Sequence, residues 1–304
     1  MSFSSDTKAE LAVIRPESAC CQTAECYGLA LFSRCFSLQE KSYVTESFPA
    51  AKKLAETLAE QAGVMAEIAT SIRRSQTKLY TVTIPGENQR QQMLAHFGHT
   101  GKETHVGINR ANLENVCCMA AFLRGAFLTC GTVTDPSKEY HLEFTVPYRQ
   151  LALQLITLLE EVEEIELHPA LVCRKGIYVV YIKGSEKIEE LLVYMGAAQA
   201  AMNLMQVKMI KEVRNHVNRT TNFETANINK TAQAAARQTE AIRRIVRTSG
   251  MESLGEDLRE VARLRLENPD MSLREMAGRL GITRSGVNHR IQKLLELAQS
   301  LPDN

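Results

Sequence analysis

The segment TRSGVNHRIQK, at residues 283–293, has the types and spacing of side chains that bind nucleic acid. Its hydroxyl, amide, imidazole and guanidinium groups can hydrogen-bond to base edges and to phosphate oxygens. A helix that started here would add the free amides of its first turn, which favour an anion. We therefore predict contact with double-stranded DNA. The candidate residues are Thr283, Arg284, Ser285, Gly286, Asn288, His289, Arg290 and Lys293.

Helix signals around this segment define the elements that would position it. A helix predicted over 252–268 stops at Pro269, because the residue before a proline disfavours helical geometry. Ser272 and Glu275 have the spacing of a capping box, which satisfies free amides where a second helix starts. Gly281 ends that helix, since glycine can take the positive φ of a sharp turn. The polar segment then opens a third helix.

Three residues across the second and third helices have helix-turn-helix spacing. Ala277 lets the helices cross closely, Gly281 makes the turn, and Val287 closes the core between them. Residues near the start of the third helix then enter the major groove. Ser272, at the start of the second helix, joins the candidate DNA contacts. Such folds also serve in dimerisation and protein docking, and the sequence leaves that alternative open.

The stretch before this module is basic and predicted to be helical. Residues 208–247 contain nine lysines and arginines against three glutamates. We predict a helix to about Arg219, a polar break over 218–229, and a second helix to the end of the stretch. A local excess of positive charge is typical of phosphate contacts, for which Arg243 and Arg244 are the candidates. A solvated charged face is the alternative interpretation.

The first two thirds of the chain contain one pattern twice. The segments CCQTAECYGLALFSRCF at 20–36 and CCMAAFLRGAFLTCGTV at 117–133 share adjacent cysteines, with a glycine eight residues after the first. Strand-like segments at 79–86 and 177–184 keep nearly the same offset of about 97 positions. In EYHLEFTV, apolar and polar residues alternate as in a half-buried strand. We predict two copies of one unit, each running helix, strand pair, helix, strand pair.

These patterns together predict an α+β fold followed by an all-α domain. The α+β part consists of two copies of an αββαββ unit. The predicted boundaries are a first repeat at 1–100, a second repeat at 101–200, a basic helical linker at 201–250 and a helix-turn-helix domain at 251–304.

Composition favours an ordinary globular protein over a membrane protein. The 304 residues are 44% hydrophobic and 23% charged. Their net charge of +1 says nothing by itself about a polyanionic partner, because only the distribution of charge could. The sequence opens without the pattern of a secretion signal. The window 116–133 approaches the length of a membrane span, but Arg124 in its middle would cost roughly 2.5–3.5 kcal/mol on insertion. We predict a buried helix there and no membrane partner.

The eight cysteines are interpreted as reduced thiols. The adjacent pairs at 20–21 and 117–118 lack the two-residue gap common in zinc sites, and no Cys/His set follows at finger spacing. Core packing is therefore the interpretation of these pairs. Three histidines in HFGHTGKETH, at 96–105, lie in glycine-rich polar surroundings that favour a loop. We predict no metal and no cofactor.

The two repeated segments resemble a worn LAGLIDADG motif over 26–34 and 123–131. In that family, two such helices pack side by side at a pseudo-twofold axis, and the following strands build a saddle over DNA. The resemblance implies that the two copies form each other's interface, and that the protein is a monomer. Homing endonucleases of this fold hold divalent metal with a carboxylate at the eighth motif position, where this chain has Ser33 and Cys130. Neither a hydroxyl nor a thiol replaces a carboxylate on magnesium, so we predict that the protein is not an enzyme.

The double motif, the basic linker and the helix-turn-helix together resemble the WhiA family of Gram-positive bacteria over essentially the whole chain. The most specific segments are CCMAAFLRGAFLTCGTVTDP, VRNHVNRTTNFETANINKT and ITRSGVNHRIQKL. The resemblance implies a DNA-binding regulator of transcription that influences cell division, chromosome segregation and sporulation. It also implies a cytoplasmic, nucleoid-associated protein whose partners are double-stranded DNA and cell-division or transcription proteins.

Two alternative functions remain open at this point. The chain could be an active nuclease, which would cut duplex DNA with magnesium and lose that activity without residues 1–196. Alternatively, the repeats could form a protein-interaction platform while the C-terminal domain alone binds DNA. In that case a fragment starting near Met251 would keep the full DNA affinity.

Overall fold

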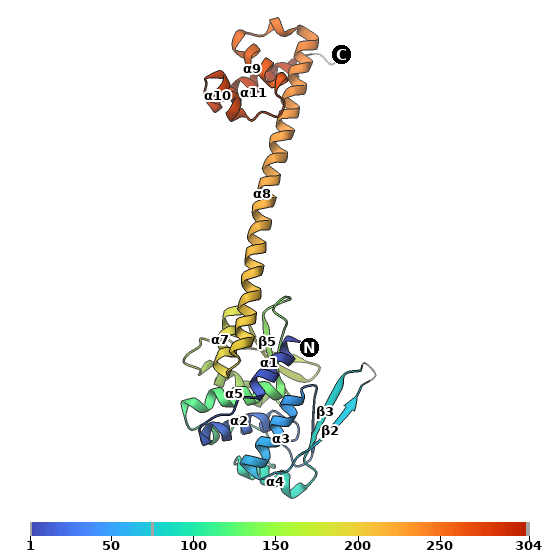
Figure 1. The fold of residues 1–304 in the computed structure, drawn as a ribbon, viewed down its shortest axis with the longest axis vertical. Helices are drawn as coiled ribbons and strands as arrows, with labels where there is room; N and C mark the ends of the chain where they lie inside the picture. The colour runs from blue at the N-terminus through green and yellow to red at the C-terminus, as the bar shows by residue number, and fades with distance from the viewer. Residues whose placement is uncertain (1, 74–75, 302–304) are drawn as a thin grey trace. The chain divides into compact units, whose positions relative to one another are not determined.

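The computed structural model describes residues 2–73 and 76–301 and forms two compact units, Met1–Lys211 and Glu212–Asn304. One long helix, α8 (Ala198–Ser249), begins in the first unit and ends in the second (Figure 1). The finer division into four segments stays a prediction.

The first unit contains both sequence repeats, preceded by helix α1 (Phe3–Ala12), which the sequence analysis did not predict. The first repeat consists of α2 (Ala19–Leu31), β1 (Ser42–Thr45), α3 (Phe48–Ala62), β2 (Glu67–Ile72), β3 (Lys78–Thr83) and α4 (Glu87–His96). A short 3-10 turn, η1 (Arg110–Asn112), leads to the second repeat. That repeat consists of α5 (Val116–Cys130), β4 (Gly131–Val133), β5 (His141–Val146), α6 (Arg149–Glu160), β6 (Ala170–Arg174), β7 (Ile177–Lys183) and α7 (Ser185–Met195).

Each repeat builds its own antiparallel sheet. The strand orders are β1-β3-β2 in the first and β4-β5-β7-β6 in the second, so β3 and β7 hold equivalent places. The predicted half-buried strand is confirmed as β5. Leu142, Phe144 and Val146 are fully buried, and Thr145, which lies between the last two, is exposed. Helices cover one face of each sheet. In a strand such as β5, every second side chain is apolar and points to this covered face.

The first repeat differs from the predicted order in one place. Among the described residues, the segment between α2 and β1 has no counterpart of strand β4. Its apolar residue Phe36 turns inward instead, with its ring 6.2 Å from those of Tyr27 and Phe97. A side chain used in this buried aromatic cluster is not available to extend the sheet. Each repeat also ends in a further helix, α4 or α7.

The two glycine-containing helices, α2 and α5, lie side by side at the centre of the first unit (Figure 1). A Cβ atom on Gly28 would lie 2.3 Å from the Phe122 carbonyl oxygen, and one on Gly125 would lie 2.3 Å from the Glu25 carbonyl oxygen. Only glycine permits this approach at the two positions. Their equivalent roles explain why the segment occurs twice, since each copy is the packing surface of the other.

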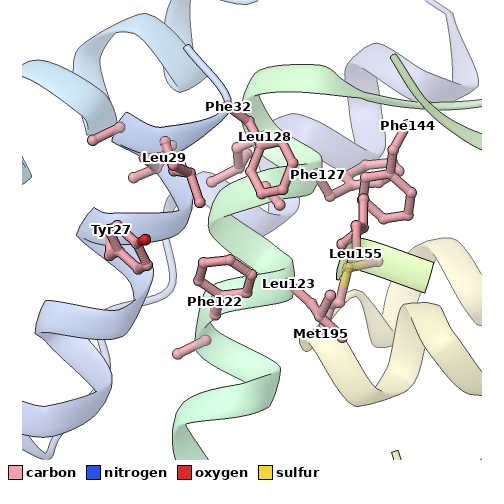
Figure 2. Close-up of a cluster of buried hydrophobic side chains, with 14 of the residues drawn as sticks. Tyr27, Leu29, Phe32, Phe122, Leu123, Phe127, Leu128, Phe144, Leu155 and Met195 are labelled. Carbon is pink, nitrogen blue, oxygen red and sulfur yellow. The ribbon is translucent and has the colours of Figure 1, made fainter. Parts of the chain in front are cut away.

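The core of the first unit surrounds this helix pair. Tyr27 and Phe122 face each other from the two helices with ring centroids 5.6 Å apart, and Phe127 reaches Phe144 on β5 (Figure 2). Full burial of a side chain of this size contributes roughly 1.5–3 kcal/mol. Because rings from both repeats pack together, neither repeat has a core independent of the other.

Helix α5 is buried by protein, as the position of Arg124 predicted. The Arg124 side chain is only 8% exposed and bonds Glu25 of α2, with 2.6 Å between Nε and Oε1. Across the described parts of the chain, no helix is both long enough and apolar enough to span a membrane.

The histidines at 96–105 are not gathered into one site. His96 ends α4, and His105 is exposed. His99 is buried, and its Nε2 lies 2.9 Å from the Tyr27 hydroxyl. Burial lowers the pKa of His99, which suits a neutral ring in the core.

The second unit is all helical. The C-terminal part of α8 packs with η2 (Met251–Ser253), α9 (Glu256–Glu267), α10 (Leu273–Leu280) and α11 (Arg284–Ser300). The fully buried residues in the core of the second unit include Ile242, Val261, Met276 and Val287. The predicted polar break at 218–229 is wrong, because α8 continues through it. Asparagine and threonine are weak helix formers, but α8 has no glycine or proline, the residues that interrupt a helix more strongly.

Candidate nucleic-acid interface

The start of α11 is fixed by three features that the sequence predicted. The Ser272 hydroxyl accepts from the Glu275 amide and the Glu275 carboxylate accepts from the Ser272 amide, which completes the capping box of α10. These hydrogen bonds lower the pKa of the Glu275 carboxyl. Gly281 takes φ +62°, a left-handed conformation that L side chains rarely adopt. Val287 is fully buried and joins α10 to α11.

The first two turns of α11 present polar side chains to solvent. Arg284, Ser285, Asn288 and His289 are exposed, and Lys293 is exposed one turn further on. The Thr283 hydroxyl caps the helix by accepting from the Gly286 amide at 3.1 Å. The structure therefore brings these predicted residues together at one end of one helix, where donors and acceptors can follow base edges. Their contact with DNA stays a prediction.

Other predicted residues are partly engaged within the second unit. Arg290 lies 3.4 Å from the carboxylate of Asp257, and its side chain is 22% exposed. Arg244 donates to the Leu301 carbonyl oxygen at 2.8 Å. Arg243, in contrast, is exposed on α8. Of the two arginines proposed for phosphate contact, Arg243 is the more accessible.

The buried Arg265 was not predicted by sequence reasoning. It lies on the inner side of α9 with 1% exposure and donates to the carbonyl oxygens of Pro269 and Met271. Burial lowers its pKa. The side chain thus holds the loop that leads to α10, and no local pattern distinguishes it from a solvated arginine.

In the first unit, Ser33 and Cys130 occupy equivalent places after α2 and at the end of α5. The Ser33 hydroxyl donates to the Ala30 carbonyl oxygen at 2.6 Å. Burial raises the pKa of the Cys130 thiol to about 12, although the positive charge of Lys8 opposes that rise. The two side chains do not fit a divalent metal ion, because they offer no carboxylate oxygen and a lysine lies beside one of them.

A cavity of about 680 Å³ opens at this end of the helix pair. Its lining contains the cationic residues Lys8, Arg34 and Lys41 against one acid, Glu40. Burial lowers the pKa of Lys8 to about 8, so its ammonium group is still mainly protonated at neutral pH. The excess of positive charge attracts an anion such as phosphate and repels a metal cation.

Comparison with known proteins decides the family. The chain is 39% identical over 312 residues to a protein of Desulfitobacterium hafniense (strain Y51) named probable cell division protein WhiA, with 100% of this chain and 97% of the relative covered. The chain belongs to the WhiA family. The same name is carried by a relative from Heliobacterium modesticaldum that is 39% identical over 313 residues and matches 99% of this chain and 97% of its own.

Family models and a crystal structure agree with this WhiA assignment. The WhiA LAGLIDADG-like domain matches residues 119–214, and the WhiA C-terminal HTH domain matches residues 217–298. A crystal structure of full-length WhiA from Thermatoga maritima is 25% identical, covers 100% of both chains and has a TM-score of 0.60. The predicted α+β, LAGLIDADG-like fold with a helical C-terminal region is therefore confirmed for this WhiA-family chain.

Proposed function

We propose that this WhiA-family protein regulates transcription by sequence-specific binding to double-stranded DNA, and so acts in cell division, chromosome segregation and sporulation. The observation that carries the proposal is the exposed polar start of α11, held by the capping box, Gly281 and Val287. A recognition helix needs this combination of a rigid position and free hydrogen-bonding groups. The names of the relatives support the cell-division role.

Basic side chains on α8 support phosphate contact. Lys208 and Lys211 are engaged in the first unit, by Glu186 and by the Pro136 carbonyl oxygen. The remaining exposed cations on this helix include Arg214, Arg219, Lys230, Arg237 and Arg243. Contacts of this kind add affinity that does not depend on sequence and weakens with salt. The protein would then reside on the nucleoid, with its two repeats forming an internal pseudo-dimer in a monomer.

Replacing Arg284 with alanine tests the recognition helix. We expect binding to the preferred site to weaken by on the order of 1–3 kcal/mol, while binding to random duplex changes much less, because this side chain is placed to reach base edges. The preferred site is first isolated as genomic fragments bound by the full chain. Fluorescence anisotropy over a salt series then gives both affinities.

Arg243→Ala is the matched comparison for this test. Arg243 is also an exposed arginine of the same unit, but it lies on α8. We expect it to weaken all sequences alike and to reduce the slope of log K against log salt by roughly one. Unchanged specific binding by Arg284→Ala would show that α11 does not read bases, and an equal loss on random DNA would make Arg284 a phosphate contact.

We further propose that the protein does not cut DNA. Ser33 and Cys130 leave the equivalent ends of the two repeats without carboxylates, and the cavity there is cationic. We expect supercoiled plasmid to stay intact with the full chain in Mg²⁺ or Mn²⁺, as followed by gel electrophoresis. Nicking that disappears when residues 1–196 are removed would instead establish a nuclease.

A further inference from the structure

The two adjacent cysteine pairs meet in space, although they are far apart in the sequence. Cys20 and Cys21 lie in the first turn of α2, and Cys117 and Cys118 lie in the first turn of α5. All four sulfur atoms lie within 4.8 Å of one another. The Sγ atoms of Cys20 and Cys117 are 3.9 Å apart. Each cysteine pair therefore lies next to the equivalent pair of the other repeat.

These distances are close to those in a zinc site with four cysteine ligands. Four thiolates around a zinc ion at about 2.3 Å in tetrahedral geometry lie roughly 3.8 Å from each other. A disulfide would require about 2.05 Å between two sulfurs. Iron–sulfur clusters place cysteine ligands on several iron atoms, and this spreads the sulfurs more widely. The observed spacing fits a single ion at the centre of the four sulfurs.

The position of the four cysteines leaves the cluster accessible from one side. Both pairs lie in the first turns of their helices, so the four sulfur atoms gather at one end of the helix pair. The Cys21 and Cys118 side chains are buried, while Cys117 is exposed and Cys20 is partly exposed. The site is thus anchored in the core and open on one side to an entering ion.

Core packing alone does not account for this cluster. Cys26 and Cys35 show what cysteines that only fill the core look like here, because both are fully buried. An exposed thiol such as Cys117 contributes little to a core. The position of Cys117 beside three other sulfur atoms is explained if the four cysteines bind one metal ion together.

We propose that Cys20, Cys21, Cys117 and Cys118 bind one Zn²⁺ ion that clamps the N-terminal ends of α2 and α5. All-sulfur ligation selects a soft-accepting metal over magnesium or calcium. Each thiol gives up its proton on binding, so four thiolates and Zn²⁺ carry a formal charge of −2 that faces the two helix N-termini. The ion would stabilise the pairing of the two repeats, independently of whether the protein binds DNA.

The experiment measures zinc in the full chain purified under reducing conditions. Elemental analysis should find about one zinc per chain. Removing it with a chelator should lower the melting temperature of the first unit by roughly 5–10 °C, and added Zn²⁺ should restore it. Substituting Co²⁺ should give the intense visible bands of a tetrahedral thiolate site.

Two single variants and one control locate the ion. Cys20→Ser and Cys117→Ser each remove one ligand without emptying the core, and each should reduce zinc content to less than half. Cys173→Ser, which changes an exposed cysteine on β6, should keep it unchanged. The proposal is overturned if the reduced protein takes up no zinc from added Zn²⁺, or if Cys20→Ser and Cys117→Ser bind as much zinc as the unaltered chain. A Cys20–Cys117 disulfide in promptly alkylated protein would also overturn it, because the pair would then be a redox couple.

Discussion

Gly125→Ala is expected to lower the free energy of unfolding of the first unit by about 3 kcal/mol. The new Cβ atom would lie 2.3 Å from the Glu25 carbonyl oxygen and 2.8 Å from the Leu29 amide nitrogen. Both obstacles are backbone atoms of α2, so no side-chain rotation can relieve the clash. The two helices would have to separate, and the aromatic contacts between Tyr27 and Phe122 would loosen with them.

Differential scanning calorimetry of the full chain measures this effect. Gly278→Ala is the matched control, because Gly278 also lies inside a helix but has nothing within 4 Å of an added Cβ. There the same change should stabilise the second unit by about 0.5–1 kcal/mol, since alanine is the better helix former. A Gly125→Ala protein whose first unit melts like the unaltered one would disprove the close helix crossing.

The helix-turn-helix could be predicted from the sequence because its signals are local. The capping box at Ser272, the turn at Gly281 and the buried Val287 each depend on residues a few positions away, and the structure has all three. The repeat was also visible, since its glycines and strands keep one offset. The prediction for α8 is wrong, because the polar composition at 218–229 indicates a break where nothing interrupts the helix.

The remaining features depend on contacts between distant segments. Arg265 is buried because loop carbonyls receive its guanidinium group, and an arginine on a charged helix gives no sign of this. The four cysteines form a cluster because two helices with equivalent starts lie side by side. Finger spacing could not detect this cluster, since it considers only residues within one short segment. The duplication itself, rather than a motif, was the available signal.

Glu25→Ala is expected to destabilise the first unit by about 3–5 kcal/mol. Glu25 is 1% exposed and holds two buried cations, Arg124 at 2.6 Å and Lys53 at 3.2 Å. Arg124 also donates to the Met195 carbonyl oxygen, and Lys53 donates to the Ile14 carbonyl oxygen. These bonds keep both cations in the core after the carboxylate is gone. The loss therefore reflects two positive charges buried without their counter-ion, in addition to the broken contacts.

The exposed pair of Arg110 and Glu161 provides the matched control. It has two N–O contacts, at 2.5 and 3.0 Å, but its side chains are 50% and 44% exposed. Water solvates each partner when the other is removed, so Glu161→Ala should change the free energy of unfolding by no more than about 0.5 kcal/mol. Chemical denaturation followed by circular dichroism measures both variants. Equal effects would mean that water reaches Glu25 and that the charge contacts between α2, α3 and α5 add little to the pairing of the repeats.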